Sequence, residues 1–170
     1  MQPTFTLRFP ETDIPRWAGR YDNPAESAVE AFAHDARTRG YLTHAELIAL
    51  GEWKSPRVRS RIAANDPDFV EAATRAAFAT PHERLRIEIL TLLRGVAWPM
   101  ASSILHWCHP DRYPILDTRA LWSLDSDPPR YDFPFWQAYT HYCREQADQA
   151  GVSMREFDRA LWQYSKEKQR

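Results

Sequence analysis

The segment Leu92–Leu124 contains the residues whose types and spacing are best suited to chemistry. Asp117 follows the apolar stretch Tyr113–Leu116 and stands where a helix is expected to begin. The N-terminus of a helix favours negative charge, so a carboxylate at this place is held in its ionised form. Asp is also a common residue that merely caps a helix. We therefore treat Asp117 as a candidate catalytic residue, with a plain N-cap as the alternative.

A tight turn is predicted earlier in the same segment, between two apolar helices. Gly95 would end the first helix, and Pro99 would lie in the first turn of the second. Such a turn presents backbone N–H groups beside a helix N-terminus, an arrangement that suits a phosphate. The layout is a helix–hairpin–helix. The candidate phosphate-binding residues in it are Gly95, Ala97 and Trp98.

The sequence has one dense basic segment, Trp53–Arg61, which contains no acidic residue. Several cations of this kind contacting phosphates would give salt-dependent binding to nucleic acid. The alternative is a solvated helix face with Trp53 in the core. The candidate phosphate ligands are Lys54, Arg57, Arg59 and Arg61.

The residues LRGVAWPMA at Leu93–Ala101, followed by Leu116–Arg119, resemble the helix–hairpin–helix DNA glycosylase superfamily, which includes endonuclease III and the adenine and 3-methyladenine glycosylases. The family pattern is L-P-G-V-G-x-K-x-A, then an apolar helix, then V-D. Asp117 follows Pro99 by 18 positions, the family's separation between the hairpin Lys and the catalytic Asp. Three other segments are similar to a family of bacterial proteins: Gly40–Thr43, Trp53–Arg57 and Arg159–Ser165. This likeness implies no activity.

The resemblance implies an all-α protein that binds duplex DNA and removes a base. Asp117 would stabilise the cationic sugar and help to orient the attacking water. The hairpin, the basic segment and Arg119 would hold the DNA. Pro99 replaces the Lys that forms a Schiff base in lyase members, so a monofunctional glycosylase is expected. Ala97 replaces the second hairpin glycine, which would crowd the approach of a phosphate.

Aromatic residues around these motifs could form a pocket for a flipped base, since such bases stack on aromatic side chains. The candidates are Trp53, Trp98 and Trp107, and either Trp53 or Arg57 could act as a wedge in the duplex. Packing in the core is the alternative for each tryptophan. A second functional hypothesis is a non-catalytic module that binds DNA or a protein partner. The departures at Ala97 and Pro99 and the near-neutral charge favour this alternative.

Composition restricts the remaining possibilities. The chain has 170 residues, which predicts one domain spanning 1–170, and a net charge of −1, so any nucleic-acid binding must come from a local patch. The 2 cysteines cannot form a four-cysteine metal or iron–sulfur centre. Two His-x-Cys units have the wrong spacing for zinc, and we expect neither metal nor cofactor. No apolar run approaches a membrane span and the N-terminus lacks a signal-peptide layout, so a cytoplasmic protein is expected.

The elements that would position these residues are helices, because glycines are few and helix-start signals are frequent. We predict an all-α bundle of about eight helices, with capping boxes at Thr43, Thr80 and Ser153. The helix opened at Thr80 should continue to Gly95. Only Thr4–Phe9 alternates like a strand. On the last helix we predict a salt-bridged outer face, and inward-facing Phe157, Leu161 and Trp162.

Overall fold

A computed structural model describes residues 3–128 and 130–169. Over these residues the chain contains ten α-helices, two short 3-10 helices and no strand, which confirms the predicted all-α class. The 3-10 helices are η1 (Glu11–Asp13) and η2 (Pro56–Val58). The α-helices are α1 (Ile14–Arg20), α2 (Glu26–Arg39), α3 (His44–Lys54), α4 (Arg59–Ala63), α5 (Pro67–Ala79), α6 (Glu83–Leu90), α7 (Trp98–Cys108), α8 (Thr118–Ser123), α9 (Phe133–Ala150) and α10 (Met154–Lys168).

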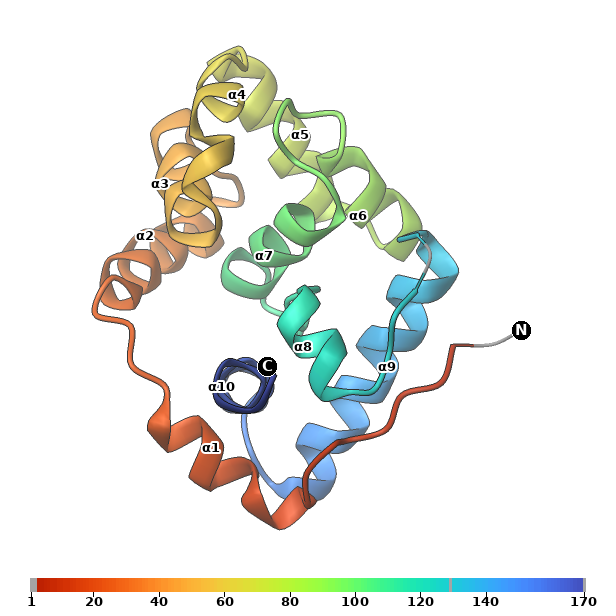
Figure 1. The fold of residues 1–170 in the computed structure, drawn as a ribbon. Helices are drawn as coiled ribbons and strands as arrows, with labels where there is room; N and C mark the ends of the chain where they lie inside the picture. The colour runs from red at the N-terminus through yellow and green to blue at the C-terminus, as the bar shows by residue number, and fades with distance from the viewer. Residues whose placement is uncertain (1–2, 129, 170) are drawn as a thin grey trace. The chain divides into compact units, whose positions relative to one another are not determined.

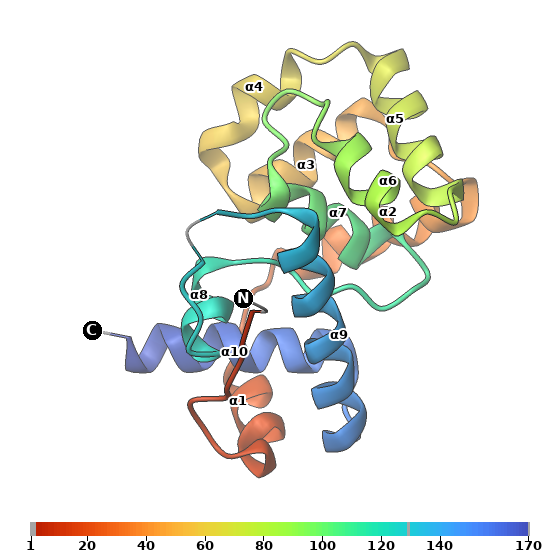
Figure 2. The ribbon, with the colours of Figure 1, turned by 90° about the vertical axis from the view of Figure 1, so that its right-hand side faces the viewer.

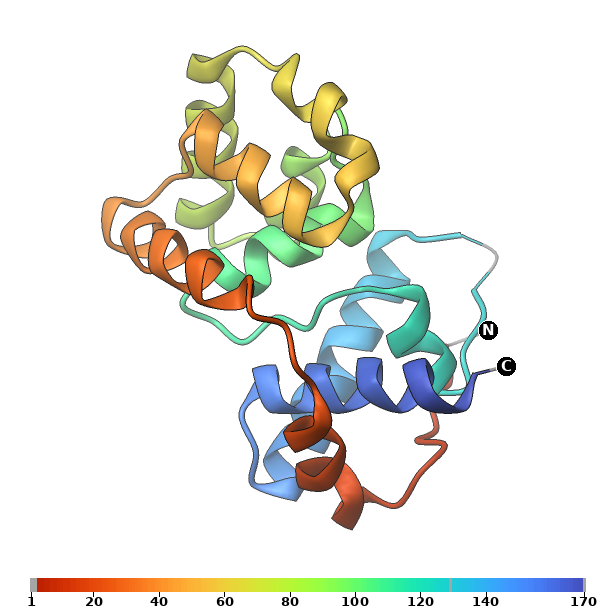
Figure 3. The same ribbon diagram turned by 60° about the vertical axis from the view of Figure 1, so that its left-hand side comes forward.

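The helices fall into two compact units. The hairpin unit comprises Asn23–Asp111 and therefore α2 to α7, whose order can be followed in Figure 3. The α10 unit comprises Met1–Asp22 with Arg112–Arg170, and therefore α1 and α8 to α10. Two such units are compatible with one domain or with two, so the expected single domain stays a prediction.

Local sequence signals account for several of the helix boundaries. Thr43 and Ser153 each form the predicted capping box, in which a side-chain oxygen accepts the N–H of a glutamate three residues on. Asp66 and Asp132 cap α5 and α9 with their carboxylates. Gly40 ends α2 in the left-handed conformation at φ 87°. These helix ends are determined locally, which is why the sequence predicts them.

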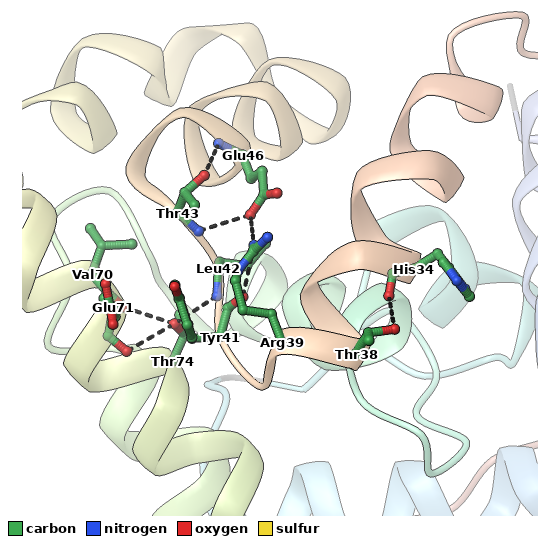
Figure 4. A network of polar contacts seen from close by, with 10 residues as sticks. All are labelled: His34, Thr38, Arg39, Tyr41, Leu42, Thr43, Glu46, Val70, Glu71 and Thr74. Atoms are coloured by element: carbon green, nitrogen blue, oxygen red, sulfur yellow. Dashed lines mark hydrogen bonds and ion pairs between the residues drawn. The ribbon is translucent and has the colours of Figure 1, made fainter.

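A polar network joins α2, α3 and α5 within the hairpin unit (Figure 4). The hydroxyl of Thr74 on α5 is buried and accepts the backbone N–H of Leu42 at 3.0 Å. Arg39 donates to the carbonyl of Tyr41 at 3.0 Å and forms an ion pair with Glu46. These contacts satisfy the backbone N–H of Leu42 and the carbonyl of Tyr41, and they tie the loop between α2 and α3 to both neighbouring helices.

The α10 unit is built around its last helix. Helices α1 and α8 pack along α10, and α9 crosses it (Figures 1 and 2). The buried hydroxyl of Ser123 at the end of α8 donates to the carbonyl of Leu161 on α10 at 2.6 Å. Tyr139 on α9 is buried and donates to the carbonyl of Ile115 at 2.8 Å. The segment that leads into α8 is therefore anchored by hydrogen bonds as well as by apolar packing.

The segment Thr4–Phe9, whose alternation is typical of a strand, does not form one. Its side chains alternate between exposed and covered positions as the sequence pattern requires. However, the N–H groups of Thr6 and Arg8 donate to the carbonyls of Leu124 and Ser123, at 2.8 and 2.9 Å. The end of a helix thus supplies the acceptors that a neighbouring strand would have supplied, because the last carbonyls of a helix have no partner within it.

Two features predicted around α6 are also wrong. Thr80 does not form a capping box: its hydroxyl accepts the N–H of His82 at 3.2 Å, and Glu83 pairs with Arg86 instead. The helix does not reach Gly95 but ends at Leu90 and is followed by turns. A capping box requires the glutamate carboxylate to return to the capping residue, and Arg86 holds it elsewhere.

Candidate nucleic-acid interface

The predicted hairpin exists in the hairpin unit and requires a glycine at its centre. Gly95 has φ 80°, a conformation that side chains with a Cβ rarely adopt. A Cβ on Gly95 would lie 2.9 Å from Cγ1 of Ile62 and 3.1 Å from its backbone N. Val96 closes the turn by donating to the carbonyl of Leu93 at 3.1 Å. The hairpin is therefore seated directly on α4, a helix that the sequence did not predict.

The side chain of Ile62 on α4 also packs closely against α3. A Cβ on Gly51 of α3 would overlap Cδ1 of Ile62, so α3 and the hairpin both approach this one side chain closely. Ile62 is fully buried. Burying an isoleucine contributes roughly 1.5–3 kcal/mol, so the short α4 gains stability from packing that its own length does not provide.

The side chain of Asn65 clamps the turn. Its Oδ1 accepts the N–H of Arg94 at 2.7 Å, and its Nδ2 donates to the carbonyl of Arg94 at 2.9 Å. Nδ2 also donates to the carbonyl of Ile62 at 2.8 Å. Asn65 is 7% exposed, so these bonds lie largely out of water. Asn65 was not among the predicted site residues, because nothing in its local pattern distinguishes it from an ordinary loop asparagine.

Basic side chains of the predicted segment lie beside this turn. The Cβ of Arg61 is 3.2 Å from the Cβ position of Gly95. Arg57, Arg61 and Arg94 are exposed, and none of them forms an ion pair among the residues that the structure describes. We call Arg57, Arg61, Arg94 and the backbone of Gly95–Ala97 the hairpin surface. Arg94 was not among the predicted ligands, although its place inside the hairpin motif could have indicated it.

The other predicted cations of the segment are less available. Arg59 is exposed and forms an ion pair with Glu52 of α3. Lys54 ends α3 and is half-buried. The positive charge of Arg59 is therefore partly neutralised by Glu52, which directly precedes the basic segment in the sequence.

The start of α7 has features that favour a phosphate site and features that oppose one. Ala97 is the N-cap, is exposed, and has no side chain able to accept a hydrogen bond from the first turn. Pro99 in that turn has no N–H to offer. Its carbonyl accepts the hydroxyls of Ser102 and Ser103 at 2.7 and 3.0 Å. The methyl group of Ala97 stands where the family pattern has glycine, and it narrows the approach to the turn.

The tryptophans predicted to form a base pocket all lie in the hairpin unit. Trp53 and Trp107 meet edge-to-face with centroids 5.5 Å apart, and Trp107 is buried. Trp98 at the hairpin is half-buried. The Trp53–Trp107 contact supports the core interpretation for Trp107 and leaves Trp98 as the tryptophan nearest the hairpin surface.

Asp117 lies in the α10 unit and caps α8 as predicted. Its Oδ1 accepts the N–H of Arg119 at 2.7 Å and of Ala120 at 3.3 Å. The preceding residues, Tyr113 to Leu116, are buried, whereas Asp117 is half-buried. The apolar approach thus anchors the chain and brings the carboxylate towards the surface.

A pocket of about 420 Å³ opens beside α8 in the α10 unit. Thr118, Trp122, Asp127 and Tyr131 are among its lining residues. Burial raises the pKa of Tyr131, and the nearby carboxylates of Asp117 and Asp127 raise it further. Tyr131 is therefore close enough to Asp117 to respond to its charge, and Trp122 lies in α8, the helix that Asp117 caps. Both are candidates to line a base pocket. Trp122 is near Asp117 in the sequence and was already a possible pocket residue on that ground. Tyr131 was not predicted, because it follows a proline-rich loop whose path no local pattern predicts.

No protein-family model, curated protein or solved structure matches this chain. The resemblance to DNA glycosylases thus rests on the motif residues alone. In the described part of the chain, no three or more His, Cys, Asp or Glu side chains are placed to hold a metal ion. None of the helices within residues 3–128 and 130–169 has both the length and the apolar character needed to traverse a bilayer.

Proposed function

We propose that this chain binds duplex DNA through the hairpin surface and is a monofunctional DNA glycosylase that uses Asp117. The observation that carries the proposal is the close approach of Gly95 to α4, which brings the exposed Arg61 next to the turn that contains the exposed Arg94. Arginines beside a helix N-terminus form a site that suits a DNA phosphate.

Electrostatics support binding at this place rather than over the whole surface. The net charge of −1 gives no general attraction to DNA. The three arginines of the hairpin surface nevertheless lack acidic partners among the described residues. Neutralising phosphates with such cations releases counterions, so the affinity should fall steeply as salt rises.

The proposed reaction is hydrolysis of an N-glycosidic bond. The bond between base and sugar breaks, the base leaves with the electron pair and takes up a proton, and water adds to the sugar carbon. Asp117 would stabilise the positive charge that develops on the sugar. Pro99 offers no amine for a Schiff base, so the product would be an intact strand with an abasic site.

Binding at the hairpin surface is tested with the double variant Arg61→Gln/Arg94→Gln. Titration of a labelled duplex at two salt concentrations should show affinity reduced about tenfold or more, and a salt slope lower by roughly 1.8 if both contacts are lost. The matched control is Arg75→Gln/Arg84→Gln, which removes two exposed arginines from α5 and α6 of the same unit. Equal losses in both variants would contradict a specific surface.

The catalytic role is tested with a duplex that contains a cationic abasic-site analogue. Wild type should prefer this analogue to undamaged duplex, and Asp117→Asn should abolish the preference. Asn accepts the same two N–H groups as Asp, so this change removes the charge and keeps the helix cap. An unchanged preference in Asp117→Asn would exclude the carboxylate from contact with the sugar cation.

A non-catalytic DNA-binding module is the second candidate. The observation that favours it is the use of the Asp117 Oδ1 as an ordinary helix cap. In this case wild type would bind both duplexes equally, with a salt dependence that the hairpin variants reduce, and Asp117→Asn would change nothing.

A further inference from the structure

Two cations lie over one half-buried ring in the α10 unit. The guanidinium of Arg119, from α8, lies 5.5 Å from the ring centroid of Trp162. The amine of Lys166, one turn further along α10, lies 5.1 Å from the same ring. Trp162 is half-buried, which corrects the prediction that it faces inward. Tyr21 meets the ring edge-on at 5.4 Å and supports it from α1's side of the unit. We call Arg119, Trp162 and Lys166 the Trp162 patch.

The patch carries an excess of positive charge. Neither Arg119 nor Lys166 forms an ion pair among the described residues. The acidic side chains of α10 nearby are already engaged: Glu167 pairs with Arg20 at 2.9 Å, and Asp158 pairs with Arg155. Neither of these two carboxylates forms an ion pair with Arg119 or Lys166 among the described residues.

Placing two cations at one ring is energetically less favourable than placing one there. A single cation over an exposed ring gains roughly 0.5–1 kcal/mol in the folded protein. A second cation at the same ring repels the first, since like charges at short range disfavour one another. An anion bound between them would relieve that repulsion, and the exposed part of the half-buried ring could contact a flat apolar group.

We propose that the Trp162 patch binds a DNA strand at an unpaired nucleotide, with phosphates held by Arg119 and Lys166 and the base stacked on Trp162. Successive cations and aromatic rings are the means by which proteins hold single strands. A base within a duplex is already stacked on both faces, so only an unpaired base offers a face to the indole. The inference rests on the proposed DNA binding.

The place of the patch also suits this role. Arg119 is in α8, the helix that Asp117 caps, and its own N–H donates to Asp117 at 2.7 Å. A phosphate held by Arg119 would thus bring the strand to the helix that carries the candidate catalytic carboxylate.

The test compares a labelled duplex containing one unpaired nucleotide with the same duplex fully paired, by fluorescence anisotropy. Trp162→Leu should weaken binding of the first duplex about tenfold without changing its salt slope, and Trp162→Phe should restore most of the affinity. Arg119→Gln/Lys166→Gln should lower the salt slope by roughly 1.8. Arg16→Gln/Lys168→Gln, which removes two cations beside the buried Trp17, is the control and should leave the affinity and the salt slope almost unchanged.

Thermal unfolding of each variant confirms that a change in binding is not a loss of folding. Equal effects on both duplexes, or equal effects of the control variant, would overturn the proposal for the patch. If the Arg61→Gln/Arg94→Gln variant loses binding while the patch variants do not, the patch proposal fails and the proposed function stands. If wild type binds neither duplex, both fail.

Discussion

The side-chain amide of Asn65 hydrogen-bonds both polar groups of the Arg94 backbone, the N–H at 2.7 Å and the carbonyl at 2.9 Å. This pairing fastens the hairpin to the loop that follows α4. The N–H and the carbonyl of Arg94 would otherwise need water or another backbone segment as hydrogen-bond partners. One buried side chain supplies both partners.

Asn65→Ala should lower the free energy of unfolding by about 2–3 kcal/mol, because it leaves the Arg94 groups without their partner in a poorly hydrated place. Urea denaturation measures this loss. Hydrogen exchange at the Arg94 amide should also accelerate. Ser60→Ala, an exposed change on α4, is the control and should remain within ~0.5 kcal/mol of wild type. A similar stability for both variants would show that the clamp contributes little.

Three glycine substitutions should separate conformational strain from steric overlap. Gly19 is in helix α1, and a Cβ added there would have no neighbouring atom within 4 Å. Gly19→Ala should therefore stabilise the protein by up to ~1 kcal/mol, because alanine has the higher helix propensity. Gly40→Ala has φ 87° and open space, so only strain of about 1 kcal/mol is expected. Gly95→Ala combines φ 80° with contacts to Ile62 and should cost the most. Thermal melts of the three variants measure the order, and a Gly95→Ala variant no worse than Gly40→Ala would contradict the close approach.

Asp117→Ala and Asp117→Asn should differ in stability. Alanine removes the acceptor of two N–H groups and should cost about 1 kcal/mol, whereas asparagine keeps it. Denaturant titration at neutral pH measures both. The difference in unfolding free energy between the two variants reports on the helix cap alone. If both variants were destabilised equally, the charge of Asp117 would matter more to stability than its hydrogen bonds.

The stability of the hairpin unit should fall in mild acid through His109. Burial, followed by the positive charge of Arg86, lowers the pKa of this imidazole, while Asp111 and Glu83 oppose the shift. The unfolded chain therefore binds a proton that the folded chain does not, below the unfolded pKa of about 6.5. The free energy of unfolding should decrease as pH falls from 7.5 to 5.5.

The pH dependence is measured by urea denaturation across that range, with His109→Asn for comparison. Asparagine offers an acceptor in place of Nδ1, which accepts the N–H of Asp111 at 3.0 Å, but it does not titrate. A slope in His109→Asn as steep as that of wild type would assign the effect to other groups.

Much of the helical framework can be predicted from local chemistry. The caps at Thr43, Asp117 and Ser153 act at the predicted places, because an N-cap requires only residues within three positions of one another. The failure at Thr80 has a local cause too, since Arg86 one turn later takes the glutamate that the box needs. The short helices α1 and α4 were not predicted, because at seven and five residues they depend on packing rather than on pattern.

By itself, the sequence determined the all-α class, the main helix caps and the hairpin around Gly95, since these depend on neighbours along the chain. Only the tertiary structure decided that Asn65 holds Arg94, that Arg61 lies beside Gly95, and that Arg119 joins Lys166 at Trp162. These pairs are 29, 34 and 47 positions apart. Contacts over such separations arise from how helices pack, and no periodicity within a single helix encodes them.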